Sequence, residues 1–252
     1  MRIATWNVNS IRTRLPRVVD FLRRSDVDVL AIQETKCKVD QFPTQAFADL
    51  GYQVAVSGAN QWNGVAILSR VDLEDAQTSF DGVPTFRNVV EPRSVFATCA
   101  GVRVGSLYVP HGRAVGDPHY QYKLQWLAAL TNQVDVSVPL CLTGDMNIAP
   151  FDEDVWDISQ FEGDTHVSPA ERDAFFALEK VGMKEVSRGL VDGYTYWDYR
   201  QLRFPKNEGM RIDFMFASPQ LAKRATAAEI DREERKGKGA SDHVPLIVTF
   251  AH

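Results

Sequence analysis

The chain has 252 residues, of which 44% are hydrophobic and 24% are charged, and its net charge is −5. This length suffices for one large domain with a sizeable core or for two small domains. The acidic balance argues against a non-specific nucleic-acid coat protein, although catalytic carboxylates can lower the net charge of an enzyme whose basic loops bind phosphates. No apolar run approaches the length that spans a bilayer, so we expect no association with a membrane.

The N-terminus and the cysteines predict a cytoplasmic location. Residues 1–21 contain neither a long apolar segment nor a small-residue cleavage site, so a secretory signal is not expected. The three cysteines, Cys37, Cys99 and Cys141, are odd in number and widely spaced. Such a pattern indicates reduced thiols rather than a disulfide framework.

Strands are predicted from apolar and alternating segments, taken in chain order. Residues 27–33, VDVLAIQ, form a mostly apolar run that is typical of a strand buried on both faces. Ala100 and Gly101 predict a tight hairpin between two later strands. The full set of expected strands is 3–7, 27–33, 52–57, 64–69, 94–99, 102–109, 139–143, 212–217, 225–230 and 244–250.

Four helices are predicted between these strands. The first begins near Leu15 with Pro16 in its first turn, and a short one covers residues 44–50. A third starts at Pro118 after Asp117 as its N-cap, and a capping box with Pro at the first position starts a fourth that runs over 169–181. Strands that alternate with helices, with no linker, predict one α/β domain over residues 1–252. We expect a four-layer α/β sandwich, with two mixed β-sheets packed face to face and helices outside.

The segment CLTGDMNIAP, residues 141–150, places a carboxylate and a carboxamide at the end of a predicted strand. Asp145 and Asn147 are two residues apart, and side chains at this spacing point to the same side of an extended chain. We therefore expect the acid and the amide to project together from the strand end.

Polar residues occur at the ends of several other predicted strands. A single residue of this kind is commonly a cap or a turn former, but a set of them at one type of location indicates a site. The set comprises Asn7, Glu34, Tyr108, Asp145, Asn147, Asp213, Asp242 and His243. No Cys or His pair has zinc spacing, and oxygen ligands favour Mg²⁺ or Mn²⁺. Since the chain has no GxxxxGK[ST] loop, the chemistry that fits is metal-assisted attack of water on a phosphodiester.

Seven motifs together carry a resemblance to a known family. They are TWNVNSIRTRL, LAIQETKC, SLYVPHGR, LTGDMNIAP, YTYWDYR, MRIDFMFAS and SDHVPLIV. In this order they resemble the exonuclease III family of apurinic/apyrimidinic endonucleases, within the endonuclease/exonuclease/phosphatase superfamily. GDxN and SDH are shared across the superfamily, whereas QETK, NIAP and YWDYR point to its DNA-repair branch. The match runs over nearly the whole chain.

The resemblance implies a site that holds Mg²⁺, with Mn²⁺ as a substitute. Glu34 resembles the principal metal ligand, with Asn7 and Asp242 close to the ion. The family uses one ion or two, and a second ion would involve Asp145, Asn147 and His243.

The resemblance also implies catalytic roles. Asp145 resembles the residue that activates the attacking water, and Asn147 helps to hold water and phosphate. His243 resembles the residue that contacts the scissile phosphate, and Asp213 its buried partner. Tyr108 resembles a phenol beside the phosphate, acting as a donor or as a proton-transfer partner.

The implied substrate is double-stranded DNA with abasic sites or 3′ ends, bound by a monomer. The implied reactions are incision on the 5′ side of an abasic site, 3′→5′ exonuclease action and 3′ end cleaning, in a balance that the sequence leaves open. Tyr196 and Trp197 resemble the aromatic residues that line a pocket for the sugar without its base. Met210 and Arg211 resemble residues that reach into the duplex, and Arg113 resembles a DNA-binding arginine.

One departure from the family pattern and two competing interpretations remain. At His111 the family more often has an amide side chain, which affects a detail of phosphate contact.

Another hydrolase of the superfamily, such as an inositol-phosphate phosphatase or a sphingomyelinase, would keep the metal and catalytic residues without needing YWDYRQLRFPK. A non-catalytic nucleic-acid-binding module would be expected to lose such residues, and none is missing here.

Overall fold

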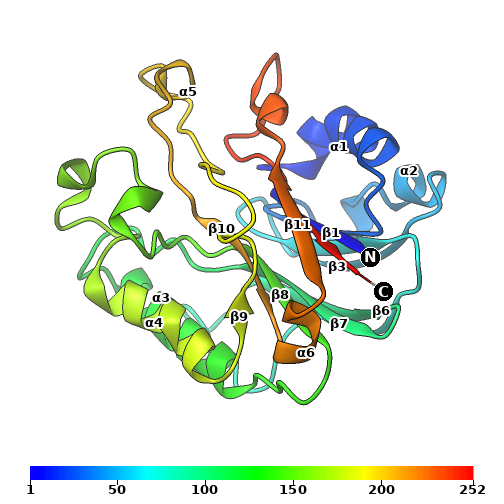
Figure 1. Cartoon of the computed structure of the whole chain (residues 1–252), viewed down its shortest axis with the longest axis horizontal. Helices are drawn as coiled ribbons and strands as arrows, with labels where there is room; N and C mark the ends of the chain where they lie inside the picture. The colour runs from blue at the N-terminus through cyan, green and yellow to red at the C-terminus, as the bar shows by residue number, and fades with distance from the viewer. Residues whose placement is uncertain (252) are drawn as a thin grey trace.

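Two six-stranded sheets form the centre of the computed structural model, which describes residues 1–251 (Figure 1). The first sheet has the order β11-β12-β1-β2-β4-β3, and the second has the order β5-β6-β7-β8-β10-β9. The strands of the first sheet are β1 (Arg2–Asn7), β2 (Val29–Gln33), β3 (Gln53–Ser57), β4 (Val65–Ser69), β11 (Ala225–Ile230) and β12 (Leu246–Phe250). Those of the second are β5 (Glu74–Gln77), β6 (Ser94–Cys99), β7 (Val102–Tyr108), β8 (Leu140–Asp145), β9 (Lys184–Glu185) and β10 (Asp213–Ala217).

Helices cover the outer face of each sheet (Figure 1). The helices are α1 (Ile11–Ser25), α2 (Thr44–Ala48), α3 (Pro118–Asn132), α4 (Pro169–Lys180), α5 (Arg203–Lys206) and α6 (Pro219–Ala222). The first two pack on the first sheet, and α3 and α4 pack on the second. The predicted four-layer α/β sandwich of two mixed sheets is therefore confirmed.

Alternation of side chains along the strands explains why both faces of each sheet are apolar. In β1, Ile3 enters the core between the two sheets, and the next residue, Ala4, enters the core under α1. In β8, Cys141 and Leu142 alternate in the same way between the inner core and the core under α3 and α4. A strand buried on both faces favours a mostly apolar run in place of strict alternation, and the apolar residues of β1 and β8 follow this pattern.

The largest error in the predicted elements concerns the first helix. It begins at Ile11 rather than near Leu15, so Pro16 lies inside the helix and not in its first turn. The backbone N–H groups of Ser10 and Ile11 donate to the carbonyls of Glu34 and Thr35, at 2.8 and 3.1 Å. These partners satisfy donors at the helix start that lack an intrahelical acceptor, and so anchor an earlier beginning.

Short elements were also missed. Strand β5 is exposed along its whole length, so its sequence lacks the alternation of apolar residues that predicts a strand. Strand β9 has only two residues. Strand β2 begins two residues later than expected, and β8 continues to Asp145, two residues beyond the expected end. The second difference matters because it places Asp145 inside the sheet.

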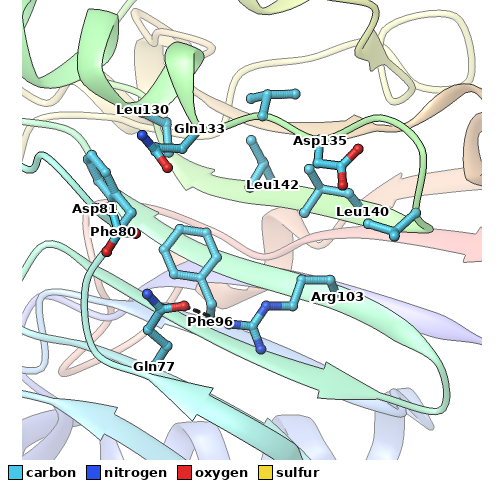
Figure 2. A pocket seen from close by; sticks show the side chains of 12 residues that line it. Gln77, Phe80, Asp81, Phe96, Arg103, Leu130, Gln133, Asp135, Leu140 and Leu142 are labelled. Carbon is cyan, nitrogen blue, oxygen red and sulfur yellow. Dashed lines mark hydrogen bonds between the residues drawn. The ribbon is translucent and has the colours of Figure 1, made fainter.

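A cavity of about 230 Å³ lies between the second sheet and the C-terminal end of α3 (Figure 2). Its walls include Phe80, Phe96 and Leu130, and Arg103 donates to Gln77 Oε1 at its edge, at 3.1 Å. None of the site residues expected from the sequence lines it. Within residues 1–251, no helix is both long enough and apolar enough to cross a membrane.

His119 makes the fold sensitive to acid. The side chain is 4% exposed, and its Nδ1 accepts a hydrogen bond from the Gly112 N–H at 3.1 Å. Burial, with help from Arg93 and Arg113, lowers the pKa of His119 from 6.5 to about 4. Between these values the unfolded chain binds a proton that the folded chain does not. Stability is therefore unaffected by this group above pH 6.5 and is lost as the pH falls towards 4, by roughly 3 kcal/mol.

We predict that His119→Gln removes most of this acid sensitivity, because Gln can accept the same hydrogen bond without titrating. The measurement is the free energy of unfolding by urea at about pH 7.5 and about pH 4.5, for both proteins. The wild type should lose more stability between the two pH values than the variant. Equal losses would show that His119 is not the responsible group.

Candidate active site

Six of the eight polar residues expected at strand ends line one cavity of about 400 Å³, and the other two, Asn7 and Asp213, are hydrogen-bonded to residues that line it. Strands β7 and β8 are parallel neighbours that place Tyr108 opposite Asp145, and β10 places Asp213 opposite Asp145 from the other side. Gly144 permits this approach, because a Cβ there would lie 1.9 Å from the Leu107 carbonyl oxygen, and its φ is +150°. The expected residues that line the cavity are Glu34, Tyr108, Asp145, Asn147, Asp242 and His243, together with Arg113, Tyr196 and Met210.

Asn7 joins the two sheets at this point. Its Nδ2 donates to Glu34 Oε1 at 2.8 Å and to Asp145 Oδ2 at 2.9 Å, while its Oδ1 accepts from the Asn9 N–H at 3.0 Å. Asn7 and Glu34 belong to the first sheet and its following loop, and Asp145 ends a strand of the second. One amide therefore holds two carboxylates in a fixed relation across the sheet interface.

His243 is held as a charged imidazole between two buried carboxylates. Its Nδ1 lies 2.8 Å from Asp213 Oδ2, and its Nε2 lies 3.7 Å from Asp145 Oδ2. Burial opposes the positive charge, but Asp213 and Asp145 more than offset it and raise the pKa of His243 to about 10. At neutral pH both ring nitrogens therefore carry protons, and Nδ1 donates to Asp213.

Asp145 has the acid–base character of a group that can accept a proton near neutrality. The pKa of Asp145 is raised to about 7, because burial and the charges of Asp213 and Glu34 outweigh the attraction of His243. A carboxylate with a pKa close to the working pH is suited to general base catalysis. A divalent cation nearby would lower that pKa.

Asn147 reaches the cavity by a turn, which corrects the expectation that alternation along a strand would place it. The strand ends at Asp145, and Asn147 lies in the left-handed region with φ at 50°. Its N–H donates to Asp145 Oδ1 at 2.9 Å, and its Nδ2 donates to the Val109 carbonyl at 2.9 Å. The acid and the amide do line the same cavity, but a side-chain-to-backbone hydrogen bond fixes their relation.

Tyr108 is suited to donating a hydrogen bond rather than to losing its proton. Burial and the neighbouring Glu34 hold the pKa of Tyr108 well above its usual value, although the guanidinium of Arg93, 4.8 Å from the ring centroid, acts in the opposite direction. Of the two roles that the resemblance implies, the structure favours the donor.

The donor set fits a divalent cation. Glu34, Asp145, Asp213 and Asp242 meet in or beside the cavity, and the cations in ion-pair contact with them are His243 and Lys36. This excess of carboxylate charge is what oxygen-liganded Mg²⁺ or Mn²⁺ would neutralise. Atoms of Asp145, Asp213 and His243 also lie within 4.8 Å of one another and could hold an ion. The carboxylates of Glu34 and Asp242, which resemble the family's metal ligands, also line the cavity.

Two residues expected to contact DNA lie outside the cavity. Trp197 is 1% exposed and packs edge-on against Phe204, with ring centroids 5.2 Å apart. Arg211 is 3% exposed and donates to the Val191 carbonyl and to Ser187 Oγ. Tyr196, by contrast, lines the cavity with its ring centroid 4.9 Å from that of His243. Strand-like alternation explains why neighbours in the chain separate in this way.

His166 is a cavity residue that the sequence did not single out. Its Nε2 lies 3.2 Å from Asn147 Oδ1, its φ is 81°, and its ring packs edge-on against His111 at 4.6 Å between centroids. Both histidines line the cavity. Since His166 lies in a loop far from any strand end, no local pattern distinguishes it from a solvated residue.

Comparison with known proteins decides the family. The sequence profile of the Endonuclease/Exonuclease/phosphatase family matches residues 4–243. The chain belongs to this family. It is a phosphodiester hydrolase of the exonuclease III type, with DNA repair nuclease activity, as the resemblance implied.

Similar proteins of this family align along the whole chain. Exodeoxyribonuclease III of Haemophilus influenzae is 27% identical over 99% of this chain and 100% of its own length. The 3′ phosphatase NExo from Neisseria, solved with a product DNA hairpin, is 36% identical, with a TM-score of 0.94 and full coverage of both chains. An AP endonuclease from Archaeoglobus fulgidus is also 36% identical, with a TM-score of 0.93 and 99% coverage of each chain.

We predict that Asp213→Asn lowers the pKa of His243 by roughly one to three pH units, because burial would then be opposed by one carboxylate fewer. Titration of the imidazole signals by NMR in metal-free buffer measures this directly. Asp20→Asn is the control, since Asp20 is an exposed carboxylate whose ion-pair partner is Arg23 on the same helix. An unchanged His243 titration in Asp213→Asn would refute the account of the charged imidazole.

Proposed function

We propose that the protein is a Mg²⁺-dependent DNA repair nuclease that acts on abasic sites and on DNA 3′ ends. It would hydrolyse the phosphodiester on the 5′ side of an abasic site, remove nucleotides in the 3′→5′ direction and clean blocked 3′ ends. The observation that carries the proposal is a buried carboxylate, Asp145, whose pKa lies near 7, placed 3.7 Å from the charged imidazole of His243.

In the proposed mechanism, the chain's own groups bind the phosphate and move one proton. The charged His243, the Tyr108 hydroxyl and Arg113 line the cavity as donors for phosphate oxygens. Asp145 takes a proton from a water molecule, whose oxygen forms a bond to phosphorus while the bond from phosphorus to the leaving 3′ oxygen breaks. The leaving oxygen then takes a proton from solvent to become a 3′ hydroxyl, and Asp145 returns its proton to solvent. The fixed imidazolium stabilises the charge that develops on the phosphate, at no reorganisation cost.

Glu34 and Asp242 would hold the metal ion, with Asn7 beside them. A bound Mg²⁺, or Mn²⁺ in its place, would supply positive charge to polarise the phosphate and stabilise the leaving oxygen.

Selection of an abasic nucleotide would follow from the apolar part of the cavity. Trp156, Phe161, Tyr196 and Met210 line it, beside the catalytic groups. A nucleotide without its base has no stacking or pairing to lose, so moving its sugar into such a pocket costs little. The likeness to both a 3′ phosphatase and an AP endonuclease, each 36% identical, supports including 3′ end cleaning as well as incision.

Action as a monomer in the cytoplasm stays a prediction from the sequence. All three cysteines are free and buried, in agreement with the reduced thiols expected there.

We predict that Glu34→Gln raises the Mg²⁺ concentration needed for cleavage of a synthetic abasic duplex, because it removes a charged ligand. Asp145→Asn should instead lower single-turnover cleavage by about 10²–10⁴ with an unchanged Mg²⁺ midpoint and unchanged DNA binding. Both midpoints come from the same nicking assay over a range of Mg²⁺. Wild-type behaviour of Glu34→Gln at low Mg²⁺, or near-normal cleavage by Asp145→Asn, would contradict these assignments.

We predict that Tyr196→Ala lowers the ratio of cleavage at an abasic site to cleavage of an intact 3′ end, since Tyr196 lines the cavity. Trp197→Ala removes a neighbouring ring that lies outside the cavity and is the matched comparison. It should reduce stability while leaving the ratio closer to that of the wild type. A ratio that falls in Trp197→Ala but not in Tyr196→Ala would place the sugar pocket on the other side of this segment.

A further inference from the structure

A fully buried ion pair lies behind the candidate active site. Lys123 on α3 and Glu171 on α4 are both 0% exposed, and the ammonium contacts the Glu171 carboxylate directly. Removing two charges from water carries a large desolvation cost. It is offset only when the two groups attract each other closely and every remaining donor and acceptor forms a hydrogen bond. The partners of these two groups therefore indicate what the pair is for.

The Lys123 ammonium uses all three of its donors. Besides Glu171, its Nζ donates to the Asn147 carbonyl at 2.7 Å and to the His111 carbonyl at 3.3 Å. These carbonyls belong to the loops that follow β8 and β7, and both residues line the cavity. One buried charge thus holds the backbones of two cavity loops.

Glu171 holds a third loop. Its Oε1 accepts from the His166 N–H at 3.0 Å and from Thr165 Oγ1 at 2.6 Å, and its Oε2 accepts from Ser168 Oγ at 2.6 Å in the capping box of α4. Thr165 Oγ1 also lies 3.1 Å from the His111 carbonyl, and its single proton can serve one acceptor at a time. Thr165 and His166 line the same cavity.

The backbone that the pair holds is unfavourable on its own. Asn147 and His166 have φ values of 50° and 81°, in the left-handed region that residues with a side chain seldom adopt. Such conformations persist where surrounding contacts determine them. Packing around the pair is also close, since a Cβ added to Gly112 would lie 2.7 Å from Thr165 Oγ1 and 3.3 Å from Lys123 Cδ.

We propose that Lys123 and Glu171 form a positioning pair for the cleavage reaction, fixing the Asn147 backbone so that its amide meets the phosphate correctly. The inference rests on the proposed function and on the role in holding water and phosphate that the family resemblance implies for Asn147, which lines the cavity. The pair itself does not touch DNA, because both side chains are completely buried. It acts through Asn147 and the loop that carries Thr165 and His166.

The alternative is that the pair only links α3 to α4. The double variant Lys123→Met/Glu171→Met separates the two roles, because apolar side chains of similar size often replace a buried ion pair without loss of stability. A positioning role predicts a folded protein whose kcat on abasic DNA falls by about 10- to 100-fold, as expected for a misplacement near 1 Å. KM should change by less than about threefold, because the groups that bind the duplex are unaltered.

Leu178→Ala is the control from the same helix. Leu178 is fully buried in the apolar core under α4, and its side chain cannot form hydrogen bonds to the cavity loops. The variant should therefore lower the melting temperature and leave kcat within about twofold of the wild-type value. A folded Lys123→Met/Glu171→Met that keeps the wild-type kcat would overturn the proposal. If that variant does not fold, Thr165→Val removes one hydroxyl of the network, and an unchanged kcat there would overturn it equally.

A double-mutant cycle with Asn147→Ala tests the path of the effect. Since the pair acts through Asn147, its loss should cost little further in the Asn147→Ala background, so the two effects should be strongly non-additive. Additive effects would show that the pair does not act through Asn147. A wild-type protein that fails to cleave abasic or 3′-blocked DNA would instead refute the proposed function, and this inference would fall with it.

Discussion

Repulsion among carboxylates crowded into one cavity is the constraint on which the site depends. Glu34 and Asp145 both accept a hydrogen bond from the amide of Asn7. Asp145 and Asp213 both lie beside the imidazole of His243. The amide of Asn7 and the charge of His243 make this arrangement tolerable in the folded chain. Burial, with the repulsion from Asp213 and Glu34, raises the pKa of Asp145, and the excess of carboxylate charge favours binding of a divalent cation.

The two-sheet architecture supplies this crowding, because the groups come from both sheets. A buried polar chain runs between the sheets beneath the site: Thr5 Oγ1 donates to Gln33 Oε1, Gln33 Nε2 donates to Ser106 Oγ, and Ser106 Oγ donates to the Ile32 carbonyl. Every partner in it is satisfied, as buried polar networks require. It ties β1 and β2 of the first sheet to β7 of the second, and so sets the register in which Asn7 can reach Asp145.

The sequence predicted the features that depend on local pattern. Mostly apolar runs such as residues 27–33 located the central strands, and polar residues at the strand ends located the site. It missed features fixed by distant contacts. The early start of α1 depends on carbonyls of residues 34 and 35, and the place of Asn147 depends on a hydrogen bond to Asp145. Alternation could not say which of Tyr196 and Trp197 would face the cavity.

Loop residues were the least predictable part of the site. His166 enters the cavity because Glu171, on the following helix, binds its N–H, and nothing in the local sequence marks that contact as functional. The capping box that predicted α4 used the same Glu171, but a capping residue at a helix start gives no sign that it also pairs with a buried lysine from another helix.

We propose that the excess carboxylate charge holds a divalent cation at Glu34 and Asp242 while His243 stays protonated. The most direct measurement is anomalous diffraction from crystals soaked in Mn²⁺. We expect one strong peak at ligand distance from the Glu34 carboxylate, about 2.0–2.2 Å away, and none at His243 Nε2. A peak at His243 Nε2 with none at Glu34 would contradict it.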